Sequence, residues 1–383
     1  MELKILSVNA PAKNEALEYI GKIANICYMR GNLDEIFSQE TELANKRALG
    51  CLNNGHHSVF DHIAVTMSIT GLDKISACVL NSIGLYSTSE RSGRYCEFKG
   101  FTDEDEILYH KWRDKIAVLL NDRELTDREK TTICNENARY FISSFATNCE
   151  MIYTINIRTM GYLVQKIRKL DTSNLKQFKY SLDILDILAY RFEKIVKSIV
   201  GKPITSNKPE EITFFGDALS TSMKEVHLDA EYLVGDCYHS VYNCSIASLG
   251  QKVRSRKLEL SVFLENEEEY YCPQIILDAG LKEEWEKDMR SISELLPQGR
   301  IVKVSEIGRV SDFFIYQVPE RICSHAMYET FKLVEKQAYS LRYSLIGKEF
   351  FVRQGENVRL KKKCEICGGC STPCNKNVFE RRW

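Results

Sequence analysis

The polar segment at residues 201–211 restricts how this chain can fold, because no continuous apolar face passes through it. It holds two of the seven prolines in 383 residues, and proline interrupts both helices and central strands. At roughly 150 residues per domain, a chain of this length forms two or three domains. We therefore predict a linker at 201–211, a first domain at 1–200, a second at 212–352, and a basic, cysteine-rich tail at 353–383.

Apolar residues recur at helical spacing over much of the chain, for example at Leu17, Ile20 and Ile23. Shorter stretches alternate between apolar and polar residues, which favours strands. These patterns predict an α+β fold that is mostly helical, and the similar elements in both parts suggest an internal duplication. We predict helices at 14–30, 38–53, 73–83, 104–121, 125–142, 148–170, 174–200, 217–234, 240–253, 281–296 and 320–343, and strands at 1–6, 64–69, 258–264, 300–305 and 347–352.

Composition excludes several classes of protein. Hydrophobic residues make up 44% and charged residues 27%, which is typical of a globular chain and not of a disordered, collagen-like or coiled-coil protein. The net charge of −1 argues against nucleic acid as the main partner. No run of 18 apolar residues predicts a membrane span, and residues 1–6 lack the apolar core of a signal peptide. The expected location is the cytosol.

The segment Ser-Thr-Ser-Glu-Arg-Ser-Gly-Arg-Tyr at residues 87–95 is the most informative motif. Its two arginines and three serines can converge on one anion, because guanidinium groups and hydroxyls both donate to phosphate oxygens. The alternative is a surface loop that contains a salt bridge.

The order of motifs around this segment resembles the flavin-dependent thymidylate synthases over roughly residues 40–170. Gly-His-His-Ser-Val-Phe-Asp-His at 55–62 comes first, and Asn-Ala-Arg-Tyr at 137–140 and Asn-Ile-Arg-Thr at 156–159 follow. One departure concerns the Arg-His-Arg triplet that the family carries before the serine. Residues 82–84 of this chain are Ser-Ile-Gly instead.

The second part supplies what the first lacks. Gln-Lys-Val-Arg-Ser-Arg at 251–256 resembles the family's Gln-x-x-Arg-His-Arg, with Ser255 in place of histidine, and residues 320–329 resemble its Arg-x-x-Ser-His-Ala helix. We therefore predict two tandem, diverged copies of a flavin-dependent thymidylate synthase-like domain, with helices around a small, mostly antiparallel sheet. Repeat 1 would supply the nucleotide loop and repeat 2 the flavin clamp, so that Arg94 and Arg254 share a cleft. A homodimer would mimic the family's tetramer.

The resemblance implies reductive methylation of dUMP to dTMP, with FAD as cofactor and methylene-tetrahydrofolate and NADPH as co-substrates. Methylation of another pyrimidine nucleotide such as UMP, or nucleotide binding without catalysis, stays open. Arg321 is the implied catalytic residue. The implied substrate-binding residues are Ser89, Glu90, Ser92, Gly93, Arg94, Tyr95, Arg139 and Gln251. The implied cofactor-binding residues are His56, Ser58, Asn156, Arg158, Arg254, Arg256 and His325.

Several of these residues also have a structural interpretation. Arg254 and Arg256 could lie on a helix surface, and His325 could be a hydrogen-bonded core histidine. His56 could simply end a helix beside Gly55, and Arg158 could pair with a local carboxylate.

Four of the fourteen cysteines crowd near the C-terminus: Cys364, Cys367, Cys370 and Cys374. Four thiolates at this spacing suit tetrahedral zinc or an iron–sulfur cluster. The alternative is a flexible tail with free thiols. In a reducing compartment the scattered cysteines are expected to be small apolar core residues.

Overall fold

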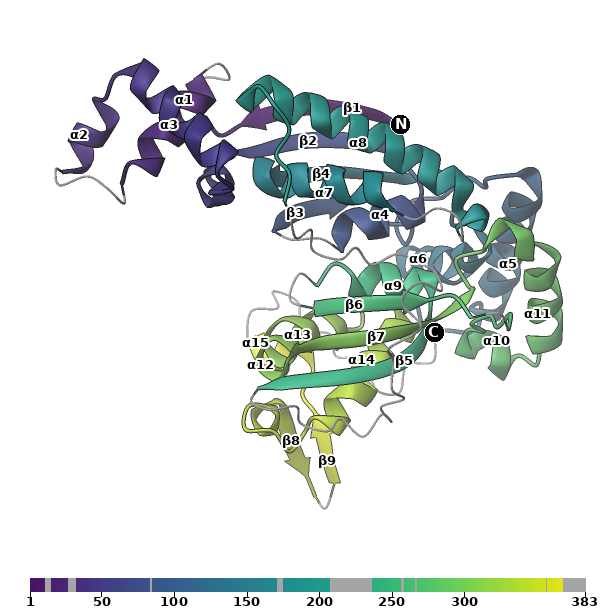
Figure 1. Ribbon diagram of the computed structural model, residues 1–383. Helices are drawn as coiled ribbons and strands as arrows, with labels where there is room; N and C mark the ends of the chain where they lie inside the picture. Colours follow the sequence, from purple (N-terminus) through teal and green to yellow (C-terminus); the bar gives the residue numbers. More distant parts are fainter. Residues whose placement is uncertain are drawn as a thin grey trace. The chain divides into compact units, whose positions relative to one another are not determined.

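The computed structural model describes residues 1–10, 15–26, 32–82, 85–170, 175–206, 236–255, 258–265, 267–355 and 357–367. They form two compact units (Figure 1). Unit 1 contains the described residues of Met1–Arg91 and Thr147–Ile212, and unit 2 those of Ser92–Ala146 and Thr213–Trp383. The expected mixture of helices and small antiparallel sheets is confirmed. The division into two sequence repeats with a linker between them stays a prediction.

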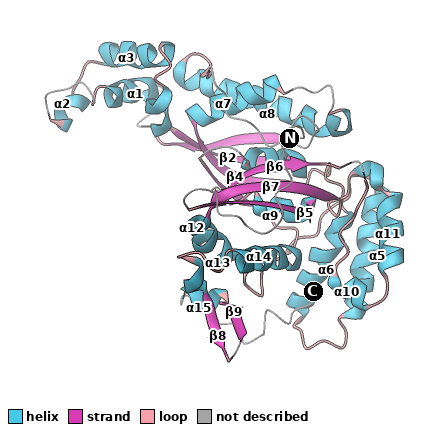
Figure 2. Cartoon of the chain, turned by 60° about the horizontal axis from the view of Figure 1, so that its bottom comes forward, coloured by secondary structure: helices cyan, strands magenta, loops and turns pink. Residues whose placement is uncertain are grey.

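Unit 1 is built on an antiparallel sheet in the order β1-β2-β4-β3. On β2 the side chains of Val65, Met67 and Ile69 are fully buried, and the residues between them are partly exposed. Helices α7 and α8 lie along this sheet (Figures 1 and 2). The strands are β1 (Glu2–Val8), β2 (Ala64–Leu72), β3 (Tyr86–Glu90) and β4 (Cys149–Asn156). The helices are α1 (Ala16–Ala24), α2 (Leu33–Phe37), α3 (Thr41–Asn53), η2 (His57–His62), α4 (Lys74–Asn81), α7 (Ile157–Lys169), η4 (Lys176–Phe178) and α8 (Lys179–Val200).

Polar residues define where these helices begin and end. Oδ1 of Asp73 accepts from the main-chain N of Ser76 at 2.6 Å and caps α4, and Oδ1 of Asn156 accepts from Thr159 at 2.7 Å and caps α7. Helix α8 ends at Gly201, whose φ of 82° is left-handed and favours glycine.

Unit 2 contains an antiparallel sheet in the order β5-β7-β6, on which Tyr242 and Val262 both pair with Val304. Helices α9 and α14 lie against it (Figures 1 and 2). The strands are β5 (Cys237–Ser245), β6 (Leu258–Phe263), β7 (Ile301–Arg309), β8 (Phe351–Gln354) and β9 (Asn357–Leu360). The helices are α5 (Asp103–Leu119), α6 (Asp127–Ala138), η3 (Arg139–Phe141), α9 (Ile246–Lys252), α10 (Gln274–Asp278), α11 (Lys282–Ser291), η6 (Ser293–Leu295), α12 (Val310–Asp312), the π-helix η7 (Phe313–Gln317), α13 (Val318–Arg321), α14 (Tyr328–Ser340), η8 (Gly347–Phe350) and α15 (Lys363–Cys367).

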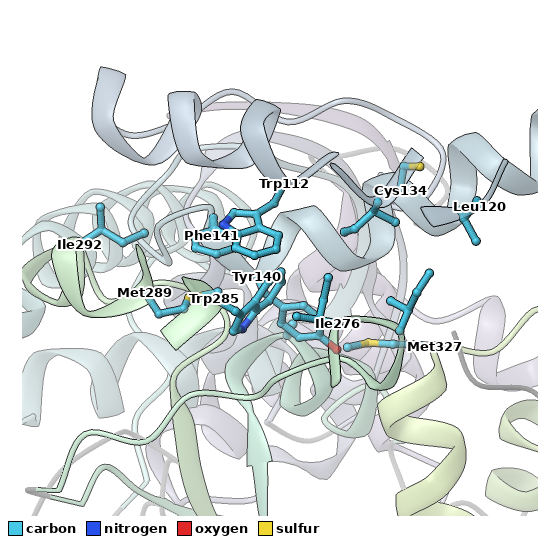
Figure 3. Packing of buried hydrophobic residues seen from close by; sticks show 13 residues of the cluster. Trp112, Leu120, Cys134, Tyr140, Phe141, Ile276, Trp285, Met289, Ile292 and Met327 are labelled. Atoms are coloured by element: carbon cyan, nitrogen blue, oxygen red, sulfur yellow. The ribbon is translucent and has the colours of Figure 1, made fainter. Parts of the chain in front are cut away.

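An aromatic cluster joins the two segments of unit 2 (Figure 3). Trp112 stacks on Phe141 at 5.8 Å between ring centroids, and Trp285 meets Phe141 edge-on at 4.6 Å. The indole N–H of Trp112 donates to Asp288 at 2.8 Å. The segment 92–146 is therefore fixed within unit 2 by buried aromatic contacts with the segment around α11.

Both sheets follow one connection pattern. In unit 1 the chain runs β2-α4-β3 and later returns through β4, which lies between β2 and β3. In unit 2 it runs β5-α9-β6 and later returns through β7, which lies between β5 and β6. This correspondence supports the predicted duplication, which stays a proposal.

Three predicted helices differ from the structure. Residues 149–156 and 237–245 are strands, although the predictions placed helices at 148–170 and 240–253. On β4 the side chains of Met151, Tyr153 and Ile155 are buried and those between them are more exposed, which is the period of a strand. In the sequence a short apolar run fits a buried helix as well as a strand. The predicted helix 320–343 is interrupted between α13 and α14.

The predicted strand 347–352 begins only at Phe351, because residues 347–350 form a 3-10 turn. The helix predicted at 217–234 lies outside the described residues. Within the described ranges, no helix combines the length and the apolar character that crossing a membrane requires.

Candidate functional site

Arg94 connects two segments of unit 2. Its Nη1 donates to the main-chain oxygen of His325, in the turn before α14, and its Nε pairs with the carboxylate of Glu136 on α6. Glu136 also accepts from the main-chain N of Tyr328 at 3.1 Å. The side chain of Arg94 is mostly buried in this arrangement.

Arg139 is a buried guanidinium that donates to a weak hydrogen-bond acceptor. Only 6% of it is exposed, and its Nη2 donates to the sulfur of Met327 at 2.8 Å. Its buried Nε has no hydrogen-bond partner among the described residues. Burial lowers the pKa of Arg139, and the nearby Arg94 lowers it further, while Glu136 opposes this. A thioether is a poor acceptor for a guanidinium, so this position is suited to an added anion.

Arg321 lies close to the same cluster. Its Nη2 donates to the main-chain oxygen of Gln251 at 3.0 Å, and the exposed Glu320 lies 3.6 Å away. Burial is the main cause that lowers the pKa of Arg321, and the guanidiniums of Arg254 and Arg94 add to it. Arg94 and Arg254 are therefore each within electrostatic reach of Arg321 inside unit 2. We name these three residues and Arg139 the arginine cluster.

The buried carboxylate of Glu329 binds residues next to Arg139 in the sequence and on β5. Glu329 on α14 accepts from the main-chain N of Ser245 at 2.7 Å, from its hydroxyl at 2.6 Å and from the hydroxyl of Tyr140 at 2.9 Å. Burial raises the pKa of Glu329, and these hydrogen bonds oppose the rise. The network holds α14 against the residue that follows Arg139.

Sequence reasoning did not identify Glu136 or Met327 as members of this site. Glu136 precedes Arg139 by one helical turn, a spacing that places both side chains on the same face. That spacing was the available signal for Glu136. For Met327 we find no signal beyond its position two residues after His325.

The predicted nucleotide motif extends over both units. Ser89 and Glu90 lie on β3 in unit 1, where Glu90 pairs with Lys74 at 3.2 Å. Ser92 lies in unit 2 and its hydroxyl accepts from the main-chain N of Arg94 at 3.4 Å. A Cβ atom at Gly93 would lie 2.6 Å from the Phe98 ring, so any larger residue there would have to displace that ring. Tyr95 is exposed, with the Arg94 guanidinium over its ring.

The cofactor residues predicted in the first part lie around the start of α7. Arg158 binds Asp61 through two hydrogen bonds, from Nε at 2.8 Å and from Nη2 at 2.5 Å. Its Nη1 has no hydrogen-bond partner among the described residues, and 31% of the side chain is exposed. Burial raises the pKa of Asp61, and the nearby Arg158 opposes this rise. Asn156 caps the helix, while His56 and Ser58 are exposed beside η2.

Other predicted residues take different places. His57, not His56, is the buried histidine, and its Nδ1 lies 2.8 Å from the hydroxyl of Tyr162. His325 contributes its main-chain oxygen to the arginine cluster. Arg254 follows α9 and lies in the cluster described above, whereas Arg256 lies outside the described residues.

The cysteine cluster is covered only in part. Cys364 is half-buried on α15, and the backbone of Cys367 ends that helix. Cys370 and Cys374 lie outside the described residues. Among the side chains that are described, no group of three or more histidine, cysteine or acidic residues could hold a metal ion. The tail site stays a prediction.

Comparison with known families adds to this geometry. Residues 11–171 match the family described as thymidylate synthase complementing protein. Over these residues the chain is similar to the flavin-dependent thymidylate synthases. Arg94, Arg139 and Arg158 fall within the region that matches the flavin-dependent thymidylate synthases, and Arg254 and Arg321 lie beyond it.

Solved structures give a weaker likeness. The flavin-dependent thymidylate synthase from Helicobacter pylori, complexed with FAD and dUMP, is 14% identical, with a TM-score of 0.34 over 51% of this chain and 93% of that chain. A UMP/dUMP methylase, PolB, from Streptomyces cacaoi bound with 5-Br dUMP is 13% identical, with a TM-score of 0.36 over 54% of this chain and 97% of that chain. No curated protein matches the sequence.

Proposed function

We propose that this protein binds a uracil nucleotide at the arginine cluster and catalyses the FAD-dependent reductive methylation of dUMP to dTMP, with methylene-tetrahydrofolate as the carbon donor and NADPH as reductant. The observation that carries the proposal is Arg139, a buried guanidinium that donates to the sulfur of Met327 and whose Nε has no hydrogen-bond partner among the described residues. A buried guanidinium with an unsatisfied donor is costly, and an anionic ligand that accepts from it removes that cost. The family match over residues 11–171 gives the anion its proposed identity.

The chain's own residues would divide the work of recognition. Arg94 and Arg139 would bind the nucleotide phosphate, because guanidiniums donate pairs of hydrogen bonds to phosphate oxygens. Ser92 already orients the main chain of Arg94 and keeps the turn compact. Glu136 pairs with Arg94 and sets the direction of its guanidinium. Ser89, Glu90, Gly93, Tyr95 and Gln251 complete the proposed substrate-binding set.

Arg321 is the proposed catalytic residue. Negative charge develops on the uracil ring during methylation, and a mostly buried guanidinium stabilises such charge more strongly than one in water. Its position is fixed by the hydrogen bond to the oxygen of Gln251. It therefore needs little reorganisation when substrate binds.

The surface at the start of α7 fits a phosphate-bearing cofactor such as FAD. Asp61 holds Arg158 by two hydrogen bonds and leaves Nη1 available as a donor. The N-terminal end of a 13-residue helix adds a favourable field for an anion. His56, Ser58 and Asn156 are the other proposed flavin residues at this surface. Arg254, Arg256 and His325 stay proposed flavin residues from the second part of the sequence. The bound flavin would supply the hydride chemistry, and the protein would supply orientation.

Two measurements test the proposal. Purified, reconstituted protein should show a flavin absorbance band, and with dUMP, methylene-tetrahydrofolate and a reductant it should form dTMP. Arg321→Lys keeps the charge but loses the fork of donors, and should reduce turnover at least 100-fold with little change in flavin content. A protein that takes up no flavin after reconstitution would contradict the enzymatic proposal.

A second candidate is nucleotide binding without methylation. It is favoured by residues 82–84, which are Ser-Ile-Gly where the family carries Arg-His-Arg. Ser255 in place of the family's histidine points the same way. Tight binding of dUMP with no flavin uptake and no dTMP would favour this candidate. Turnover of UMP but not dUMP would favour methylation of a different nucleotide.

The tandem duplication and the homodimer belong to the same proposal. The shared β2-β4-β3 and β5-β7-β6 order supports two related copies within one chain. Light scattering on the purified full chain should give twice the mass of 44.2 kDa. A stable monomer with full activity would contradict the dimer.

A further inference from the structure

Unit 2 contains a buried ion pair that the proposed reaction does not use. Lys252 and Glu306 are both fully buried, and Nζ of Lys252 lies 2.9 Å from Oε2 of Glu306. Nζ also donates to the side-chain oxygens of Gln317 and Gln337, each at 3.1 Å. The three donors of the ammonium group are therefore all engaged.

Glu306 is equally well satisfied. It accepts from the hydroxyl of Tyr238 at 2.5 Å and from that of Tyr242 at 2.6 Å. The amide of Gln337 lies 3.3 Å from the same carboxylate and 3.2 Å from the hydroxyl of Ser240. We name Lys252, Glu306, Gln317, Gln337, Tyr238 and Tyr242 the lysine hub.

The side chains of the lysine hub come from five elements of unit 2. Lys252 ends α9, Glu306 lies on β7, Gln317 ends the π-helix and Gln337 lies on α14, while the two tyrosines come from β5. An apolar cluster of similar volume often gives equal or greater stability than a buried ion pair. The stability of unit 2 alone therefore does not explain this network.

The hub stands between the segments that carry the site's arginines. Gln251, the neighbour of Lys252, accepts from Arg321 at 3.0 Å through its main-chain oxygen. Arg321 follows Gln317 by one helical turn, and Arg254 follows Lys252 by two residues. The charges of Lys252 and Arg321 are close enough to interact. Fixing Lys252 to Gln317 thus fixes the end of α9 relative to the helix that bears Arg321.

We propose that Lys252 is a positioning residue: through Glu306 and Gln317 it sets the distance between the end of α9 and α13, and so keeps Arg321 against the oxygen of Gln251 in the orientation that a nucleotide requires. The part of this inference that concerns the nucleotide rests on the proposed function. The part that concerns the Arg321–Gln251 contact does not.

The double variant Lys252→Met/Glu306→Gln tests the inference. It removes both charges together, so no unpaired ion stays buried, and glutamine can still accept from a tyrosine. We expect the denaturation midpoint, followed by the fluorescence of Trp112 and Trp285, to stay near that of the wild type. We expect phenylglyoxal to label Arg321 at least threefold faster, as measured by peptide mass spectrometry, with the exposed Arg290 as internal reference.

The matched control is Val334→Ala, which opens a cavity at a fully buried position of α14 outside the hub. It should lower the midpoint and leave the Arg321 labelling ratio unchanged. The dissociation constant for dUMP should rise at least tenfold in the double variant and less than twofold in the control. An unchanged labelling ratio in the double variant would overturn the inference, as would a ratio that rises equally in the control.

Failure of the two proposals can be told apart. If the wild-type protein binds no dUMP, the proposed function fails, and the labelling ratio still decides whether Lys252 positions Arg321. If the wild type binds dUMP but the double variant labels and binds like it, the proposed function stands and the positioning role of Lys252 is wrong.

Discussion

The guanidinium of Arg94 pairs with the carboxylate of Glu136 and, through another nitrogen, donates to the main-chain oxygen of His325. One side chain thus connects the turn after β3, helix α6 and the turn before α14. The three come from distant parts of the sequence and belong to one compact unit. A ligand that binds Arg94 therefore meets a group whose direction is already fixed.

Removing Arg94 should weaken nucleotide binding and spare flavin. Arg94→Ala alone would leave Glu136 buried without its partner, so the better variant is Arg94→Ala/Glu136→Gln. A charge-assisted hydrogen bond contributes about 1.5–3 kcal/mol, which corresponds to a dissociation constant for dUMP raised roughly 10- to 100-fold. Calorimetric titration with dUMP and flavin absorbance measure the two effects separately.

The control for that experiment is Arg91→Ala. Arg91 lies three residues earlier, and its partly exposed side chain lies 3.5 Å from Glu150. Its removal should change the dissociation constant less than twofold. Equal loss of nucleotide and flavin in the Arg94 variant would contradict the assignment of this side chain to the nucleotide.

We expect Arg139 to lower the unfolding free energy of the free protein and to contribute to the binding of dUMP. Arg139→Met replaces a buried guanidinium by an apolar side chain, and the acceptor it loses is only the sulfur of Met327. We expect the unfolding free energy to stay constant or rise by about 1–2 kcal/mol, because the cost of burying the charge disappears. The affinity for dUMP should fall at least tenfold. A marked loss of stability with unchanged affinity would show that Arg139 is a structural residue.

Local signals predicted many elements of this fold correctly. Helix α5 was predicted at 104–121 and spans 103–119, where Thr102 and Asp105 form a capping box. Strand β6 was predicted at 258–264 and spans 258–263. In both cases the apolar residues fit only one period, which is the helical period for α5 and the alternating period of a strand for β6.

The remaining differences arise from contacts distant in sequence. The segment that becomes β4 contains an apolar run that suits a helix as well as a strand, and β5 mixes apolar and polar residues. Both segments pair as strands, β4 with β2 and β3 and β5 with β7. The contact of Trp112 with Trp285, at 4.8 Å between ring centroids, has no local signature. It carries the segment 92–146 into unit 2, and with it Arg94 and Arg139.

The tail cysteines give a prediction that needs no structure of the tail. Metal analysis of the full chain should find about one zinc ion per chain, or iron with acid-labile sulfide if the site holds a cluster. A chain that ends at Lys363 should lose this metal. Cys370→Ser should reduce the content as well, whereas Cys323→Ser, outside the tail, should not. Equal metal content in the full and shortened chains would exclude a site at these cysteines.

Asp73 gives unit 1 a dependence on pH that can be isolated by one substitution. Burial raises the pKa of this carboxyl from 3.8 to about 6, and Ser181 and Ser76 oppose the rise. The folded chain therefore holds the proton at pH values where the unfolded chain has released it, and the unfolding free energy decreases as pH rises from about 4 to above 6. At about 1.4 kcal/mol per pKa unit, the decrease is about 3 kcal/mol.

The variant Asp73→Asn keeps a cap for Ser76 and should remove this dependence of the unfolding free energy on pH. Denaturant titrations followed by circular dichroism measure it. The control Asp183→Asn, at an exposed position of α8, should retain the dependence. Parallel slopes in the wild type and Asp73→Asn would exclude a raised pKa at this position.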